Sequence, residues 1–242
     1  MGRITRYMLG LAIGAGLSLS ALSAQAAVID IDSIGGVHGT VVNTQFPGVT
    51  ISRLNSSNPA VAFNTSLSGT NDPDLEAPFE APIGAGSLPA GLSPGPTNPG
   101  FILVSNNNSQ NCGTGICSNV NDAVGSTLRF DFDETVDLQF LDLFDLDDGG
   151  SSAEITLFSG GAQTVNGAQV GDNGSLTVDI GQFFGSAQTN VDAFEVRFQG
   201  SGGLDRIVFD PPGTDVPEPA TLALIGSGLL AAGALTRRRR RA

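Results

Sequence analysis

The stretch Ser126–Leu146 reads STLRFDFDETVDLQFLDLFDL and holds the clearest secondary-structure pattern in the chain. From Leu128 to Asp133 apolar and polar residues alternate strictly, the period of two that is typical of a strand with one buried face. Glu134 and Thr135 predict a turn, after which a second long strand runs to Leu146. One face of that strand is apolar except for Asp142, and the opposite face also carries leucines. This pattern predicts a central strand, or a bulge that switches faces midway.

Outward from this stretch, short apolar runs alternate with Gly, Pro, Asn and Asp, which predicts further strands and no helix before the C-terminal tail. Residues 68–100 are rich in Pro and Gly and predict a long surface loop. The fold class is therefore all-β, an antiparallel β-sandwich with a jelly-roll-like order. The expected strands outside the opening stretch are 28–31, 37–42, 49–54, 60–65, 101–105, 153–159, 175–180, 194–199 and 206–209.

The N-terminus has the three parts of a secretory signal peptide. Arg3 and Arg6 give a positive start, and Met8–Leu22 is a short apolar run. Ala24 and Ala26 form an A-x-A cleavage site, so the mature chain is predicted to begin at residue 27.

The C-terminal tail, Val216–Ala242, also has three parts: a Pro-Glu-Pro triplet, an uncharged apolar run and an arginine cluster. As a helix, the run 220–235 would rise about 24 Å, somewhat less than a bilayer core of about 30 Å. The arginines are expected to stay cytoplasmic, which puts the rest of the chain across the membrane. A permanent tail anchor and a buried core helix are the alternatives. The triplet is Pro217, Glu218 and Pro219, and the cluster is Arg237, Arg238, Arg239, Arg240 and Arg241.

With these features in this order, the tail resembles the PEP-CTERM sorting signal of Gram-negative bacteria. The resemblance implies that an exosortase, a membrane-embedded transpeptidase similar to cysteine proteases, recognises the triplet and removes the tail. The cargo then moves to the cell surface or its extracellular polymer. On this interpretation the triplet is read by another enzyme and catalyses nothing.

The chain therefore divides into a signal peptide (1–26), an acidic domain (27–215) and a sorting signal (216–242). Its formal charge is −13, and all eleven basic residues are arginines. Outside the leader and the terminal cluster, four arginines remain against 24 acidic residues, a formal charge of −20. Because nucleic-acid binding needs a cationic surface, this charge disfavours a nucleic-acid partner. Most of the acidic residues are explained by solubility.

Cys112 and Cys117 are the only cysteines. In an exported protein so close a pair predicts a local disulfide that shapes a loop, and no further metal ligands of the right type lie near it in sequence.

The middle of the chain also resembles exported galactose-binding-like and lectin-like β-sandwich domains. The resemblance rests on residues 59–65, 72–75, 128–148 and 203–209. It implies the sandwich fold and permits glycan or calcium binding. Acidic residues at expected strand ends suit calcium, which prefers several oxygen ligands from loops, although solvated turn aspartates are the plainer interpretation. The candidate calcium ligands are Asp72, Asp74, Asp145, Asp147 and Asp205.

No catalytic motif accompanies these residues, and the lone His38 has no Ser or Cys motif around it. The mature body lacks Trp and Tyr, the usual stacking platforms for sugars. We therefore expect a non-catalytic surface or extracellular-matrix protein, with signal peptidase and exosortase as processing partners and transient retention in the inner membrane. The alternative is a calcium-assisted carbohydrate-binding module acting on extracellular polysaccharide, and a hydrolase using acidic residues ranks last.

Overall fold

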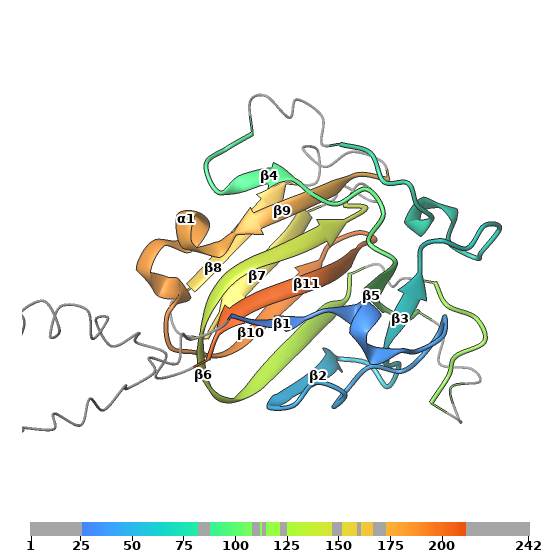
Figure 1. The fold of residues 1–242 in the computed structure, drawn as a ribbon, viewed down its shortest axis with the longest axis horizontal. Coiled ribbons are helices and arrows are strands. Elements are labelled where there is room, and N and C mark those ends of the chain that lie inside the picture. Colours follow the sequence, from blue (N-terminus) through green and yellow to red (C-terminus); the bar gives the residue numbers. More distant parts are fainter. Residues whose placement is uncertain are drawn as a thin grey trace, which may run out of the picture. The chain divides into compact units, whose positions relative to one another are not determined.

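The structure is a computed structural model, and it describes residues 26–81, 88–107, 112, 115–121, 125–146, 152–158, 161–166 and 173–211. Within these ranges the chain is mostly strand (Figure 1). The strands are β1 (Ala27–Ile29), β2 (Val49–Leu54), β3 (Ala60–Asn64), β4 (Leu92–Pro94), β5 (Phe101–Ser105), β6 (Thr127–Phe144), β7 (Ser152–Leu157), β8 (Gly161–Asn166), β9 (Ser175–Asp179), β10 (Val191–Phe198) and β11 (Gly203–Asp210). The helical turns are η1 (Ile31–Ile34), η2 (Pro73–Leu75), α1 (Ile180–Phe184) and η5 (Gly185–Gln188).

Strand β6 organises the fold, because its two halves belong to two different sheets. Its first half lies between β2 and β10, and the sheet continues through β7 to β8. Its second half lies between β9 and β11, and that sheet continues to β4 on one side and to β5 and β3 on the other. Every pair of named strands is antiparallel, which confirms the predicted all-β antiparallel class. The jelly-roll order stays a prediction.

The predicted turn at Glu134 and Thr135 is wrong, because β6 is continuous through these residues. The pairing with β10 shows what the structure has in place of a turn. Asp131 pairs with Ala193, and Val136 pairs with Val191, so five steps along β6 face only two along β10. The extra residues form a bulge, and a bulge bends its strand. The chain does not reverse its direction here, as it would in a turn. It passes from the first sheet into the second.

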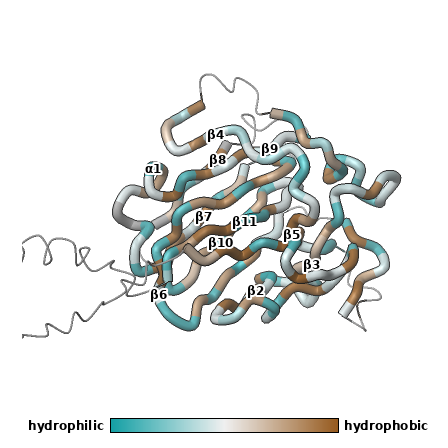
Figure 2. Tube along the Cα trace, viewed as in Figure 1, coloured by the Kyte–Doolittle hydropathy of each residue, from teal (hydrophilic) through white to brown (hydrophobic). Residues whose placement is uncertain are grey.

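The core lies between the two sheets, where the inward faces of their strands meet. Phe130 of β6 stacks on Phe194 of β10 with ring centroids 4.4 Å apart, and both are fully buried. Leu141 and Leu143 are also fully buried, as expected for a strand paired on both sides. Hydrophobic residues gather in the middle of β7, β10 and β11 (Figure 2). A second apolar cluster under β3 and β5 contains Phe63.

Other predicted elements needed smaller corrections. The expected strand 37–42 forms only single bridges at Thr40 and Val41, and residues 31–34 form a helical turn instead of ending β1. The loop 68–100 contains η2 and β4. A short helix, α1, follows β9, although no helix was expected in the body; Asp179 caps it by accepting a hydrogen bond from the backbone N–H of Gln182.

In the described part of the chain, no helix is long and apolar enough to cross a membrane. The predicted tail helix, 220–235, lies outside the described residues.

Candidate functional site

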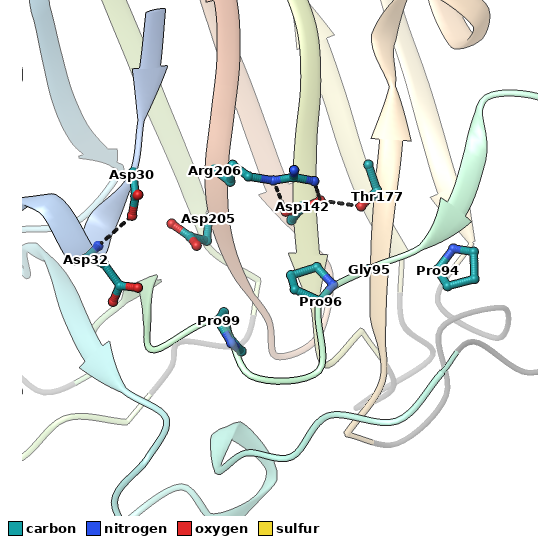
Figure 3. Close-up of a pocket in the computed structure, with 10 residues that line it drawn as sticks. All are labelled: Asp30, Asp32, Pro94, Gly95, Pro96, Pro99, Asp142, Thr177, Asp205 and Arg206. Carbon is teal, nitrogen blue, oxygen red and sulfur yellow. Dashed lines mark hydrogen bonds and ion pairs between the residues drawn. The ribbon is translucent and has the colours of Figure 1, made fainter.

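A polar pocket of the described body lies over the second half of β6. It has a volume of about 430 Å³ and is bounded by β6, β9, β11, the start of η1 and the loop that follows β4 (Figure 3). Pro94 at the end of β4 and Pro96 and Pro99 in the loop form a wall of prolines, while the strands contribute charged and hydroxyl side chains. We call this the acidic pocket. Its polar residues are Asp30, Asp32, Asp142, Thr177, Asp205 and Arg206.

Asp205 lies on β11 and is only 5% exposed. One carboxylate oxygen, Oδ1, accepts a hydrogen bond of 3.1 Å from the backbone N–H of Ile31. Burial raises the pKa of Asp205 to about 7, with a smaller upward contribution from the charges of Asp30 and Asp32, while backbone hydrogen bonds act in the opposite direction. Near neutral pH this carboxyl group therefore exchanges a proton, and its neutral form can donate a hydrogen bond into the pocket.

Asp142 is fully buried and forms an ion pair with Arg206. Nε and Nη2 of Arg206 lie 2.7 Å and 3.1 Å from the two carboxylate oxygens, a bidentate arrangement. The hydroxyl group of Thr177 also donates to Asp142. The hydrogen bonds to Asp142, together with its charge, raise the pKa of Arg206. A buried carboxylate of this kind needs such partners, since an unpaired charge in the interior is costly.

A bulge in β11 positions Arg206. Asp205 pairs with Asp142, and Val208 pairs with Phe140, so three steps along β11 face two along β6. Arg206 takes the extra position with φ of 44°, a left-handed conformation that is uncommon for a residue with a side chain. The bulge turns the guanidinium towards Asp142 while half of the side chain, 51%, stays exposed.

Asp30 and Asp32 secure the edge of the pocket. Asp30 accepts a hydrogen bond from the backbone N–H of Asp32 and caps η1. Asp32 accepts one of 2.7 Å from the backbone N–H of Phe101, at the start of β5. Gly100 lies so close to Asp32 that a Cβ there would approach its carboxylate to 2.4 Å. The pocket edge is therefore a fixed junction between the N-terminal segment and the loop before β5.

Among the described residues, the predicted calcium ligands are distributed over different parts of the fold. Of these residues only Asp205 lines the acidic pocket. Asp72 is buried and precedes η2, while Asp74 lies within η2. Asp145 is buried and accepts hydrogen bonds from the backbone N–H of Asn173 and from Ser201 Oγ, and Asp147 lies outside the described residues. Nowhere in the described ranges do three or more His, Cys, Asp or Glu side chains form a group that can hold a metal ion.

The acidic pocket contains residues that sequence reasoning did not select. Asp142 gave a signal, because it interrupts the apolar face of its strand. Asp30, Asp32 and Arg206 gave none, since their proximity to Asp142 follows from strand pairing between distant segments: Arg206 is 64 residues from Asp142 in sequence, and Asp30 and Asp32 are farther away.

His38 has a structural role. Its Nδ1 accepts a hydrogen bond of 3.2 Å from the backbone N–H of Asn64, its ring packs edge-on against Phe63, and burial lowers its pKa. The imidazole is therefore neutral at pH 7 and serves as a partly buried acceptor.

Cys112 and Cys117 form the predicted disulfide. Cys117 is buried, and its backbone N–H donates to the carbonyl of Gly39. Ala26 is exposed just before β1. The remaining predicted processing residues lie outside the described part: Ala24, Pro217, Glu218, Pro219, Arg237, Arg238, Arg239, Arg240 and Arg241.

A second pocket, of about 350 Å³, lies at the bulge in the middle of β6 and is lined mainly by apolar residues. We call it the terminal pocket, because both the first and the last strand of the body reach it. Its walls include Ala27, Val49, Phe132, Val136, Phe209 and Pro211.

Comparison with known proteins identifies the tail. A family model described as the PEP-CTERM protein-sorting motif matches residues 215–241. The tail is a PEP-CTERM sorting motif. This match confirms the sorting signal expected from the triplet, the apolar run and the arginines, and it supports exosortase-dependent sorting of an exported protein. No curated protein and no solved structure gave a significant match to the chain.

Proposed function

We propose that the protein is an exported, non-catalytic protein of the cell surface or extracellular matrix. Its PEP-CTERM tail holds it in the inner membrane until an exosortase removes the tail. The observation that carries this proposal is the motif at 215–241. The predicted leader agrees with it, because β1 begins at Ala27, the first residue after the expected cleavage site.

Two properties of the body suit this route. The Cys112–Cys117 disulfide fits an oxidising compartment outside the cytoplasm. The large excess of acidic residues keeps an exported body soluble and repels other acidic surfaces. In the acidic pocket, Asp142 is held by Arg206 and Thr177, so this carboxylate is engaged in structure and is not poised as a nucleophile or base.

Replacing Pro217, Glu218 and Pro219 with alanine tests the proposal. We expect uncleaved precursor to accumulate in the membrane, because the processing enzyme loses the residues it reads. Intact mass of the membrane-bound and released protein measures both trimmed ends. A matched control replaces Pro212 and Gly213, just upstream of the motif, and should be processed normally. Release of the triplet variant at the normal rate, with its tail removed, would refute the assignment.

The second candidate function is a calcium-assisted carbohydrate-binding module. What favours it is the acidic pocket, whose volume of about 430 Å³ lies within the usual range for small-ligand sites. Carboxylates, a hydroxyl group and a half-exposed guanidinium can bind sugar hydroxyls, and the prolines offer apolar surface to the sugar ring. Calcium at this site would have to take part of its oxygen ligands from the glycan, because the described carboxylates form no group of three or more that can hold a metal ion by themselves.

Thermal melts with calcium and with a chelator, together with retention on a glycan array, separate the two functions. A ligand that binds only the folded state raises its melting temperature. A rise with calcium and retention of a glycan, both lost in Asp205→Asn, would favour the binding module. Unchanged melting and no retention would leave the non-catalytic cargo.

A further inference from the structure

The two ends of the body lie side by side. β1, the first strand, pairs with β11, the last, so that Ala27 lies opposite Phe209 and Ile29 opposite Ile207. β6 already occupies the other side of β11 along this length. β1 therefore fills the edge of β11 where β5 ends. Pro211, the last described residue, therefore lies close to Ala27, at which the mature protein is predicted to begin.

The terminal pocket lies beside these two ends of the described body, and both Ala27 and Pro211 line it. Phe132 of β6 packs against Phe209 of β11 with ring centroids 5.1 Å apart and reaches Phe194 of β10 on its other side at 6.0 Å. The backbone N–H of Asp133 donates to the carbonyl of Gly48 over 2.9 Å, which ties the turn before β2 to β6. The apolar walls are therefore held in place by packing and strand pairing.

The rim of the pocket is acidic. Asp133 and Glu134 line it, and both are exposed. They belong to the bulge of β6, at which the strand passes from one sheet into the other. An apolar pocket of about 350 Å³ with two carboxylates at its rim fits an aliphatic or aromatic side chain that has a basic residue as its neighbour.

Chain length keeps this pocket close to the sorting motif. Five residues, 212–216, separate Pro211 from the Pro-Glu-Pro triplet. Fully extended, the six steps from Pro211 to Pro217 span at most about 22 Å. An enzyme bound at the triplet therefore works within about 22 Å of Pro211 at the pocket wall, close to the combined diameter of two helices.

The charge of this end distinguishes between possible occupants. An acidic rim on a strongly acidic body is repelled by anionic lipid headgroups and by a second copy of the same rim. Neither repulsion acts on a protein that presents basic and apolar residues to the rim. The occupant that fits is therefore a protein of this kind that must also approach the triplet.

We propose that the terminal pocket is a docking site for the exosortase that processes the tail. The inference rests on the proposed function, because it takes exosortase processing as given. Docking raises the effective concentration of the triplet at the membrane enzyme, as a second linked contact does in any two-site interaction.

Charge reversal tests the rim. Asp133→Lys combined with Glu134→Lys should slow tail removal roughly three- to tenfold, because rim charges act mainly on the rate of encounter. The matched control reverses two other exposed acidic residues that do not line the pocket, Asp74→Lys and Glu80→Lys, and should be processed at the wild-type rate. Pulse-chase labelling of the full-length precursor measures the rates. Equal rates for wild type and the rim variant, or equal slowing by the control, would overturn the proposal.

Site-specific photocross-linking identifies the occupant directly. A benzophenone side chain at position 134 of the full-length precursor should cross-link to the exosortase, and the same probe at position 80 should not. Cross-links from position 134 to lipid alone, or to another copy of the chain alone, would contradict the docking site.

The triplet variant keeps the two proposals apart. If that variant is still processed normally, the sorting assignment fails. If it is blocked while the rim variant is processed at the wild-type rate and position 134 gives no exosortase cross-link, only the docking site fails.

Discussion

At the scale of single residues, Asp205 has the most unusual environment among the carboxyl groups of the acidic pocket. Its pKa is raised from 3.8 to about 7, chiefly by burial. The groups that face it are Asp30 and Asp32 from the N-terminal segment, Asp142 from β6 and Arg206 from β11. Because the folded state holds this proton more tightly than the unfolded chain, the stabilisation is full below pH 4 and is lost as the pH rises to about 7.

This dependence of stability on pH gives a prediction for Asp205→Asn. The asparagine Oδ1 can still accept the hydrogen bond from Ile31 but carries no charge at any pH. We expect wild-type stability to fall between about pH 4 and 7 and the variant to lack this component, becoming more stable than wild type at pH 8 by about 2–4 kcal/mol. Urea unfolding across this pH range measures the difference.

The exposed Asp192→Asn is the matched control and should follow the wild-type profile. Parallel pH profiles for wild type and Asp205→Asn would contradict a raised pKa at this position.

At the scale of elements, the disulfide loop supports the second apolar cluster. Cys117 and Val120 are buried against Ile102 and Val104 of β5. The loop also pairs with the segment after η1 through the bridge between Thr40 and Ile116. The disulfide thus fixes a loop that covers one end of the sheet.

Replacing both Cys112 and Cys117 with alanine should lower the free energy of unfolding by about 2–3 kcal/mol. About 2 kcal/mol of this comes from the entropy that so short a loop regains in the unfolded chain, and the rest from lost packing at Cys117. Chemical denaturation measures the change. Wild type in reducing agent is the control. Its free energy of unfolding should fall only by the entropic contribution of about 2 kcal/mol, because the Cys117 side chain stays in place. An unfolding midpoint equal to that of oxidised wild type would rule out this role.

At the scale of the whole molecule, the shared strand β6 makes the two sheets one cooperative unit. Its first half contributes Phe130 and its second half Leu141 and Leu143 to a single core cluster. Residues 25–214 also form one compact unit by themselves. Neither sheet keeps its buried face covered if the other unfolds.

A chain of residues 27–211, without leader and tail, should therefore fold alone and unfold in one transition. Differential scanning calorimetry checks this, with the van't Hoff enthalpy expected to equal the calorimetric enthalpy. Two separate heat-absorption peaks would show that the sheets unfold independently.

Local patterns were sufficient to predict the fold class and most strands. The alternation of Leu128, Phe130 and Phe132, and of Phe194, Val196 and Phe198, records which side chains face the core, because successive side chains in a strand point to opposite faces. The leader and the tail were predicted for a similar reason: a linear signal is read along the chain, so its residues lie next to one another in sequence.

What only the tertiary structure decided depends on contacts between distant segments. The apparent turn at Glu134 and Thr135 is a bulge, and its form is set by the partner strand β10. The acidic pocket joins Asp32, Asp142 and Arg206 from three strands or turns. The terminal pocket exists because β1 pairs with β11 across almost the whole body. Pairing between strands that are far apart in sequence cannot be predicted from the hydrophobic pattern. That pattern specifies which face of a strand is buried but not which strand lies beside it.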